Sequence, residues 1–157
     1  LNFLILLITL FYLVTFSLFI WIFLHTENIN NQILIIYVLS ICISTDVGGY
    51  IFGKIFKGKK ITKISPNKTY SGMIGSFLTS FIITFFLFIN LDLKINIYII
   101  TLIISSLTQI GDLIISLLKR RAKIKDTGSF LPGHGGLLDR IDGILLALPI
   151  GIVLVSI

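Results

Sequence analysis

The apolar runs of this chain constrain its fold more than any other feature. Residues 3–24 carry no charged side chain, and as a helix they would be about 33 Å long, enough to cross a bilayer core of about 30 Å. Apolar residues make up 55% of the sequence and charged residues 13%, so these segments lack the polar faces of soluble helices. Alternation with a period of two is absent, which argues against a transmembrane barrel. We therefore expect an all-α polytopic membrane protein.

Four further segments extend this prediction to about five transmembrane helices. Residues 33–44 are apolar but short, and they reach spanning length only if the helix continues to about Gly53. The remaining candidates are residues 73–89, residues 95–118 and residues 143–157. The chain begins at Leu1 and ends inside an apolar run, so we expect one transmembrane domain, residues 1–157, that lacks residues at least at its front.

The basic residues lie in two of the connections between these spans. Residues 54–70 hold six lysines and residues 119–140 hold six lysines and arginines, whereas the other connections hold only Lys94. Because Lys and Arg concentrate on the cytoplasmic side of membrane proteins, both polar loops are predicted to face the cytoplasm from the cell inner membrane. Basic loops also orient membrane proteins of many other functions, so this pattern alone indicates topology.

The acidic residues need a different explanation, because they contribute little to orientation. Of seven acidic side chains in the chain, Asp126, Asp139 and Asp142 lie within residues 123–142. If LLDRIDG begins the fifth helix, Asp139 and Asp142 share a face at its N-terminal end, which favours anions. Complementing the helix dipole and pairing with Arg140 account for one of these acids but not for three.

Two more acids lie inside predicted spans. A carboxylate at that depth costs about 3 kcal/mol on insertion scales, so Asp112 indicates a functional site, with a hydrogen bond to a neighbouring helix as the alternative. Asp46 presents the same argument in the second span. It shares one helix face with Gly49 and Gly53, and that face suits close helix packing or a ligand.

The types of polar residue point to Mg²⁺ and phosphate. Carboxylates without paired cysteines or several histidines favour Mg²⁺ over zinc, and such sites leave room for substrate phosphates. Candidate phosphate-binding groups accompany them: Ser65, Lys68 and Thr69 in SPNKTY, and Lys119, Arg120, Lys125, His134, Gly135, Gly136 and Arg140 in the later loop. SPNKTY lacks the spacing of a Walker loop, and His134 suits a turn as well as a phosphate.

The stretch SLLKRRAKIKDTGSFLPGHGGLLDRID, residues 116–142, resembles the signature of the phosphatidate cytidylyltransferases, also called CDP-diacylglycerol synthases. The matching positions are Ser116, Lys119, Arg120, Lys125, Asp126, Gly128, Pro132, His134, Gly135, Gly136, Asp139, Arg140 and Asp142. DVGGYIFG, SPNKT and the GDL at 111–113 extend the resemblance to residues 44–142. The chain departs from it at Ser71 and Ile115, where many members carry glutamate.

The resemblance implies a membrane enzyme that joins CTP and phosphatidate to give CDP-diacylglycerol and pyrophosphate. It implies a catalytic set of Asp126, Asp139, Asp142 and Lys125. Mg²⁺ is expected on carboxylates drawn from Asp112, Asp126, Asp139, Asp142 and Asp46, with a second cation left open. The expected partners are CTP, phosphatidate and membrane lipid, without nucleic acid, and a homodimer is left open.

Three other functions were weighed against this one. The CDP-alcohol phosphotransferases also place aspartates at membrane helix ends, but their DG-x2-AR spacing is absent from this chain. A membrane cation transporter would use Asp46 and Asp112 within the spans. A structural membrane subunit leaves the clustered acids unexplained. Release of pyrophosphate that depends on CTP, compared with ion flux without nucleotide, distinguishes the enzyme from the transporter.

Overall fold

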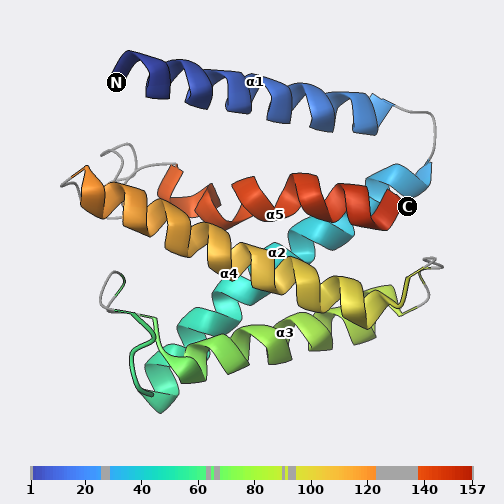
Figure 1. Cartoon of the computed structure of the whole chain (residues 1–157). Coiled ribbons are helices and arrows are strands. Elements are labelled where there is room, and N and C mark those ends of the chain that lie inside the picture. Colours follow the sequence, from blue (N-terminus) through green and yellow to red (C-terminus); the bar gives the residue numbers. More distant parts are fainter. Residues whose placement is uncertain are drawn as a thin grey trace.

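The computed structural model describes residues 2–25, 29–62, 65, 68–89, 91, 95–122 and 138–156, with the side chains of 2–10, 29–30 and 138–140 left out of that description. Five helices make up nearly all of it. They are α1 (Asn2–His25), α2 (Ile29–Phe56), α3 (Tyr70–Phe88), α4 (Ile97–Arg121) and α5 (Leu138–Ser156). The predicted all-α architecture is therefore confirmed, and the five predicted helices are present (Figure 1), although within the described residues not all five have spanning length.

Three helices in the described part are long and apolar enough to span a membrane. They are Asn31–Phe56, Tyr70–Phe88 and Ile97–Arg121, and the shorter apolar helices Phe11–His25 and Ile141–Ser156 accompany them. α2 continues through the glycines to Phe56, which confirms that the short apolar run 33–44 extends to spanning length and carries Asp46 with it.

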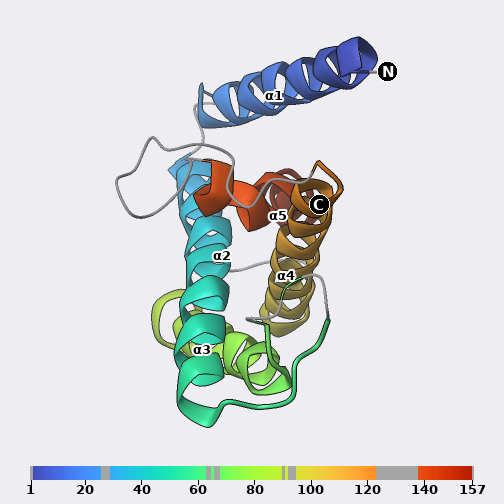
Figure 2. The same cartoon turned by 90° about the vertical axis from the view of Figure 1, so that its left-hand side faces the viewer.

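The helices pack around α2, which crosses between α3 and α5 and contacts α4 as well (Figures 1 and 2). α1 lies apart, beside α5, and the Tyr12 hydroxyl donates a hydrogen bond to the Leu145 carbonyl across this boundary. The end of α2, the start of α3, the end of α4 and the start of α5 all lie at one end of the bundle, at the left in Figure 1. Segments that are far apart in the sequence therefore meet there.

Buried aliphatic side chains and hydroxyls hold the bundle together. Val38 and Ile41 of α2, Ile104 of α4 and Ile152 of α5 have no exposed surface. Several polar contacts join helices, and one of them places the Tyr37 hydroxyl of α2 2.8 Å from Thr101 Oγ1 of α4. Such hydrogen bonds join helices in apolar surroundings, where the hydrophobic effect between helices is weak.

Glycines bring α2 and α3 close together at the end of the bundle where the connections meet. A Cβ atom on Gly72 would lie 2.7 Å from the Gly49 carbonyl oxygen, and one on Gly49 would lie 2.8 Å from Ser76 Oγ. Only residues without a side chain permit this approach. Of the two uses predicted for the glycines beside Asp46, close helix packing is thus the one that the structure shows.

The connection between α2 and α3 is folded back on itself. Lys57 adopts φ 44°, in the left-handed region that ends many helices. Lys60 and Thr69 form an isolated antiparallel bridge, in which the Ile61 N–H donates to the Lys68 carbonyl at 2.9 Å. Thr69 then caps α3, its Oγ1 accepting from the Gly72 N–H at 3.1 Å. These contacts fix the backbone on both sides of Lys68.

Candidate active site

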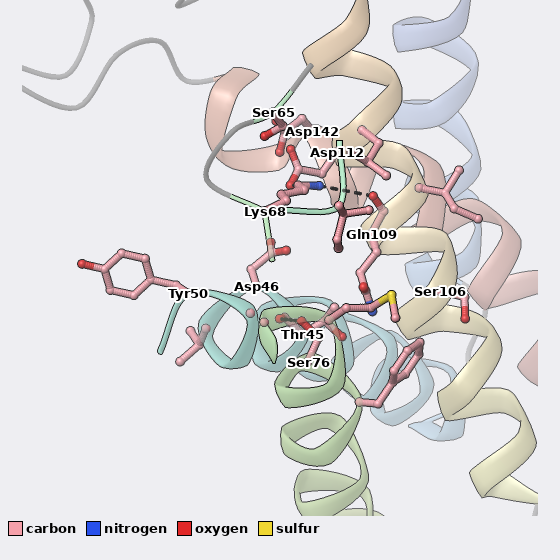
Figure 3. Close-up of a pocket in the computed structure, with 18 of the residues that line it drawn as sticks. Thr45, Asp46, Tyr50, Ser65, Lys68, Ser76, Ser106, Gln109, Asp112 and Asp142 are labelled. Atoms are coloured by element: carbon pink, nitrogen blue, oxygen red, sulfur yellow. Dashed lines mark hydrogen bonds and ion pairs between the residues drawn. The ribbon is translucent and has the colours of Figure 1, made fainter. Parts of the chain in front are cut away.

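A cavity of about 680 Å³ opens where α2, α3, α4, the start of α5 and the α2–α3 connection meet. Figure 3 shows polar side chains entering it from each of these segments. The polar residues that line it are Thr45, Asp46, Ser65, Lys68, Thr69, Ser76, Ser106, Gln109, Asp112 and Asp142. The structure thus brings together residues that the sequence placed in four separate motifs.

An ion pair lies at the centre of the cavity. Lys68 Nζ is 2.5 Å from Asp112 Oδ2, and it also donates to the Gln109 carbonyl at 3.4 Å (Figure 3). The side chains of Lys68 and Asp112 are 22% and 29% exposed, so water reaches the pair only in part. Ser116 Oγ, one helical turn further along α4, donates to Asp112 Oδ1 at 3.5 Å. The lysine of SPNKTY and the carboxylate of the fourth helix therefore form one charged unit.

Asp142 reaches the same place from near the start of α5. Its side chain is buried and lies against that of Asp112 (Figure 3). Asp142 Oδ1 accepts from the Gly143 N–H at 3.0 Å, and Oδ2 lies 3.9 Å from Lys119 Nζ. Two carboxylates thus face each other between two lysines, an arrangement that favours a cation between the acids and anionic groups beside the lysines.

Asp46 lies on the α2 side of the cavity, below Lys68 in Figure 3. Its carboxylate is near enough to Asp112 and Lys68 for all three charges to interact. Three helices, α2, α4 and α5, therefore each contribute one carboxylate to the cavity wall.

The residues of SPNKTY and the last turn of α4 occupy different positions. Ser65 and Lys68 line the cavity. Thr69 lines it too, but its hydroxyl caps α3 and bonds to Ser71 Oγ at 3.0 Å, so it has a structural role at the least. Lys119 and Arg120 lie in the last turn of α4.

Several predicted site residues lie outside the described residues. They are Lys125, Asp126, His134, Gly135 and Gly136, together with the side chains of Asp139 and Arg140. α5 begins at Leu138, so LLDRIDG does start the fifth helix and positions 139 and 142 both fall near its beginning. The roles assigned to these residues stay predictions.

The described carboxylates provide part of what a Mg²⁺ site needs. Within the described residues, no group of three histidine, cysteine or acidic side chains is close enough to hold a metal ion. Asp112 and Asp142 are adjacent, however, and Mg²⁺ is commonly bound by one or two carboxylates, with water and substrate phosphates filling its other positions. The pair therefore fits an ion that a bound nucleotide would help to hold.

Sequence reasoning missed the polar residues deeper in the cavity. Thr45, Ser76 and Gln109 line it below the charged cluster. Gln109 is a polar interruption in the apolar run 95–118, which is the signal that could have identified it. The hydroxyl residues gave no signal, because Ser and Thr are ordinary in membrane helices.

Apolar helices of spanning length around this charged cavity define an integral membrane protein with a polar interior site. The particular family follows from the sequence comparison: the model of the Cytidylyltransferase family matches residues 2–157. The chain belongs to this family, which confirms the predicted resemblance. The comparisons give the transporter alternative no support.

Named relatives agree with this assignment. The chain is 42% identical over 120 residues to the phosphatidate cytidylyltransferase of Staphylococcus haemolyticus, covering 74% of this chain and 46% of that protein. It is 41% identical over 141 residues to the phosphatidate cytidylyltransferase of Rickettsia felis, covering 82% of this chain and 60% of that protein. The chain therefore spans about half the length of the curated relatives it matches.

Proposed function

We propose that the full-length protein joins CTP and phosphatidate to give CDP-diacylglycerol and pyrophosphate, and that the reaction takes place in this cavity. The observation that carries the proposal is the convergence of Asp46, Asp112 and Asp142 with Lys68 in one cavity of a membrane protein. Relatives that are named phosphatidate cytidylyltransferase support the choice of substrates.

The chemistry is a nucleotidyl transfer in which the protein supplies position and charge. A phosphate oxygen of phosphatidate attacks the α-phosphorus of CTP in line, the bond from that phosphorus to the bridging oxygen breaks, and pyrophosphate leaves. Lys68 and Lys119 would neutralise phosphate oxygens, and Arg120 lies one residue further along α4 for the same purpose. Holding both substrates in this geometry accounts for much of the expected acceleration.

Asp112 and Asp142 are the described residues that would hold Mg²⁺, with Asp46 beside them. When bound, the ion would offset charge on the triphosphate and its leaving group. The predicted ligands Asp126 and Asp139, and a role for Lys125, belong to the same proposal. A second cation and a homodimer remain open.

The cavity also suits a lipid substrate. Its wall includes Ile43, Val47 and Ile110, which are 55%, 49% and 48% exposed and in a membrane would meet acyl chains. Asp112 lies in the half of α4 that ends in basic residues, and the end of α2 and the start of α5 lie at the same end of the bundle (Figure 1). By the positive-inside rule we place that end at the cytoplasmic face of the inner membrane, where CTP is available.

The proposal is tested with the full-length protein in mixed micelles of detergent and phosphatidate. We expect pyrophosphate release that requires CTP, phosphatidate and Mg²⁺ together, and CDP-diacylglycerol as the lipid product. The same protein in liposomes is expected to give no cation flux without nucleotide. Flux without turnover would replace the proposal by the transporter.

A further inference from the structure

Gln109 carries the one buried side-chain nitrogen or oxygen without a hydrogen-bond partner among the described residues, its Nε2. The residue lies on α4, one turn before Asp112, and lines the cavity. Figure 3 shows its side chain extending into the cavity and away from the Lys68–Asp112 pair, while its backbone carbonyl accepts from Lys68. A buried donor left unpaired costs free energy, so such a group needs an explanation.

The hydroxyl groups that line the cavity near Gln109, in contrast, have hydrogen-bond partners. Thr45 Oγ1 donates to Ser105 Oγ at 3.0 Å, and Ser76 Oγ donates to the Thr45 carbonyl at 2.7 Å. Ser106 Oγ donates to the Leu102 carbonyl of its own helix at 2.7 Å. Among the buried side-chain polar atoms of the described residues, this amide nitrogen is thus the exception, and a ligand group that pairs with it must be an acceptor.

The position of Gln109 along α4 identifies that acceptor. Three residues of helix separate it from Asp112, which places it about 4.5 Å further from the basic end of α4. The cavity lining also includes the apolar residues Met73, Phe77 and Ile110. In a diacyl glycerophospholipid, the ester carbonyls follow the phosphate in the direction of the acyl chains, whereas a nucleotide would approach from the water side. The acceptor expected at this depth is therefore an ester carbonyl.

We propose that Gln109 Nε2 donates a hydrogen bond to an acyl ester carbonyl of phosphatidate while the lipid phosphate lies beside Lys68. This inference rests on the proposed function and adds a substrate-binding residue to it. Gln109 and Lys68 would bind the two ends of the glycerol phosphate unit, and the enzyme would select ester-linked over ether-linked lipid.

The test compares diacyl and dialkyl phosphatidate as substrates of the full-length enzyme at saturating CTP. The dialkyl lipid keeps the phosphate and the chains but lacks the carbonyls. We expect its KM to be about tenfold higher than that of the diacyl lipid, the effect of one hydrogen bond. Gln109→Leu should raise the KM for diacyl phosphatidate to the dialkyl value, so that the difference disappears, and leave the KM for CTP unchanged.

Gln32→Leu is the matched control, because Gln32 is the only other glutamine, is exposed, and lies near the start of α2, away from the cavity. This variant should keep the wild-type preference. Equal KM values for both lipids with the wild-type enzyme would overturn the inference, even if Gln109→Leu did not fold. A rise in the KM for CTP alone would also overturn it. If the wild-type enzyme released no pyrophosphate from CTP, the proposed function itself would fall.

Discussion

Replacing Lys68 by methionine removes the cation of the central ion pair and keeps the length of the side chain. The two charges are 2.5 Å apart, and their side chains are 22% and 29% exposed. Fully exposed pairs contribute about 0.2–1 kcal/mol, whereas removing one partner of a buried pair costs about 3–5 kcal/mol. Because the exposure of this pair lies between these two cases, we expect Lys68→Met to lower the free energy of unfolding by about 2 kcal/mol.

The loss is measured by thermal unfolding in detergent, where about 2–4 °C corresponds to 1 kcal/mol for a chain of this size. Asp112→Asn should cost less than Lys68→Met, because it also relieves the repulsion between Asp112 and Asp142. The double variant should cost about 1 kcal/mol less than the sum of the two, because a single substitution leaves a charge without its partner. Lys59→Met, at an exposed lysine of the same connection, serves as the control. Strictly additive effects, or a Lys68→Met variant as stable as the control, would refute the ion pair.

Three other predictions concern packing and chemistry. Gly72→Val should destabilise the protein by about 1–3 kcal/mol, because its side chain would meet the Gly49 carbonyl; an unchanged unfolding temperature would exclude the close contact of α2 and α3. Thr69→Ala should cost about 1 kcal/mol through loss of the α3 cap, whereas Thr69→Ser should retain most of the stability. Asp126→Asn should abolish CTP turnover without changing expression or the unfolding temperature, and near-normal turnover would remove this carboxylate from the mechanism.

The sequence predicted those features that depend on local pattern. Uncharged runs predicted the helices, and the position of the basic residues predicted which helix ends would share one end of the bundle. Spacing placed Gly49 on a helix face suited to close packing or to a ligand, and the structure places it against α3. Acids in apolar surroundings were identified because a charge there requires a partner, and Asp112 has one in Lys68.

The pairings themselves were not predictable. Lys68 reaches Asp112 because the α2–α3 connection is folded back by the bridge between Lys60 and Thr69, and no spacing in the sequence specifies that turn. The unpaired state of the Gln109 amide depends on every hydroxyl around it finding a partner elsewhere. These pairings depend on the packed structure, whereas the sequence gives only the type of each residue and its position along a predicted membrane span.

A structure of the full-length protein with CTP and Mg²⁺ bound tests the central claim most directly. The account predicts the triphosphate in the cavity between α2, α4 and α5, with phosphate oxygens near Lys68 and the ion on Asp112 and Asp142. It also predicts an opening beside Ile43 and Ile110 through which a lipid can enter. A nucleotide bound elsewhere, with Lys68 and the two carboxylates making no contact to it or to the ion, would contradict the account.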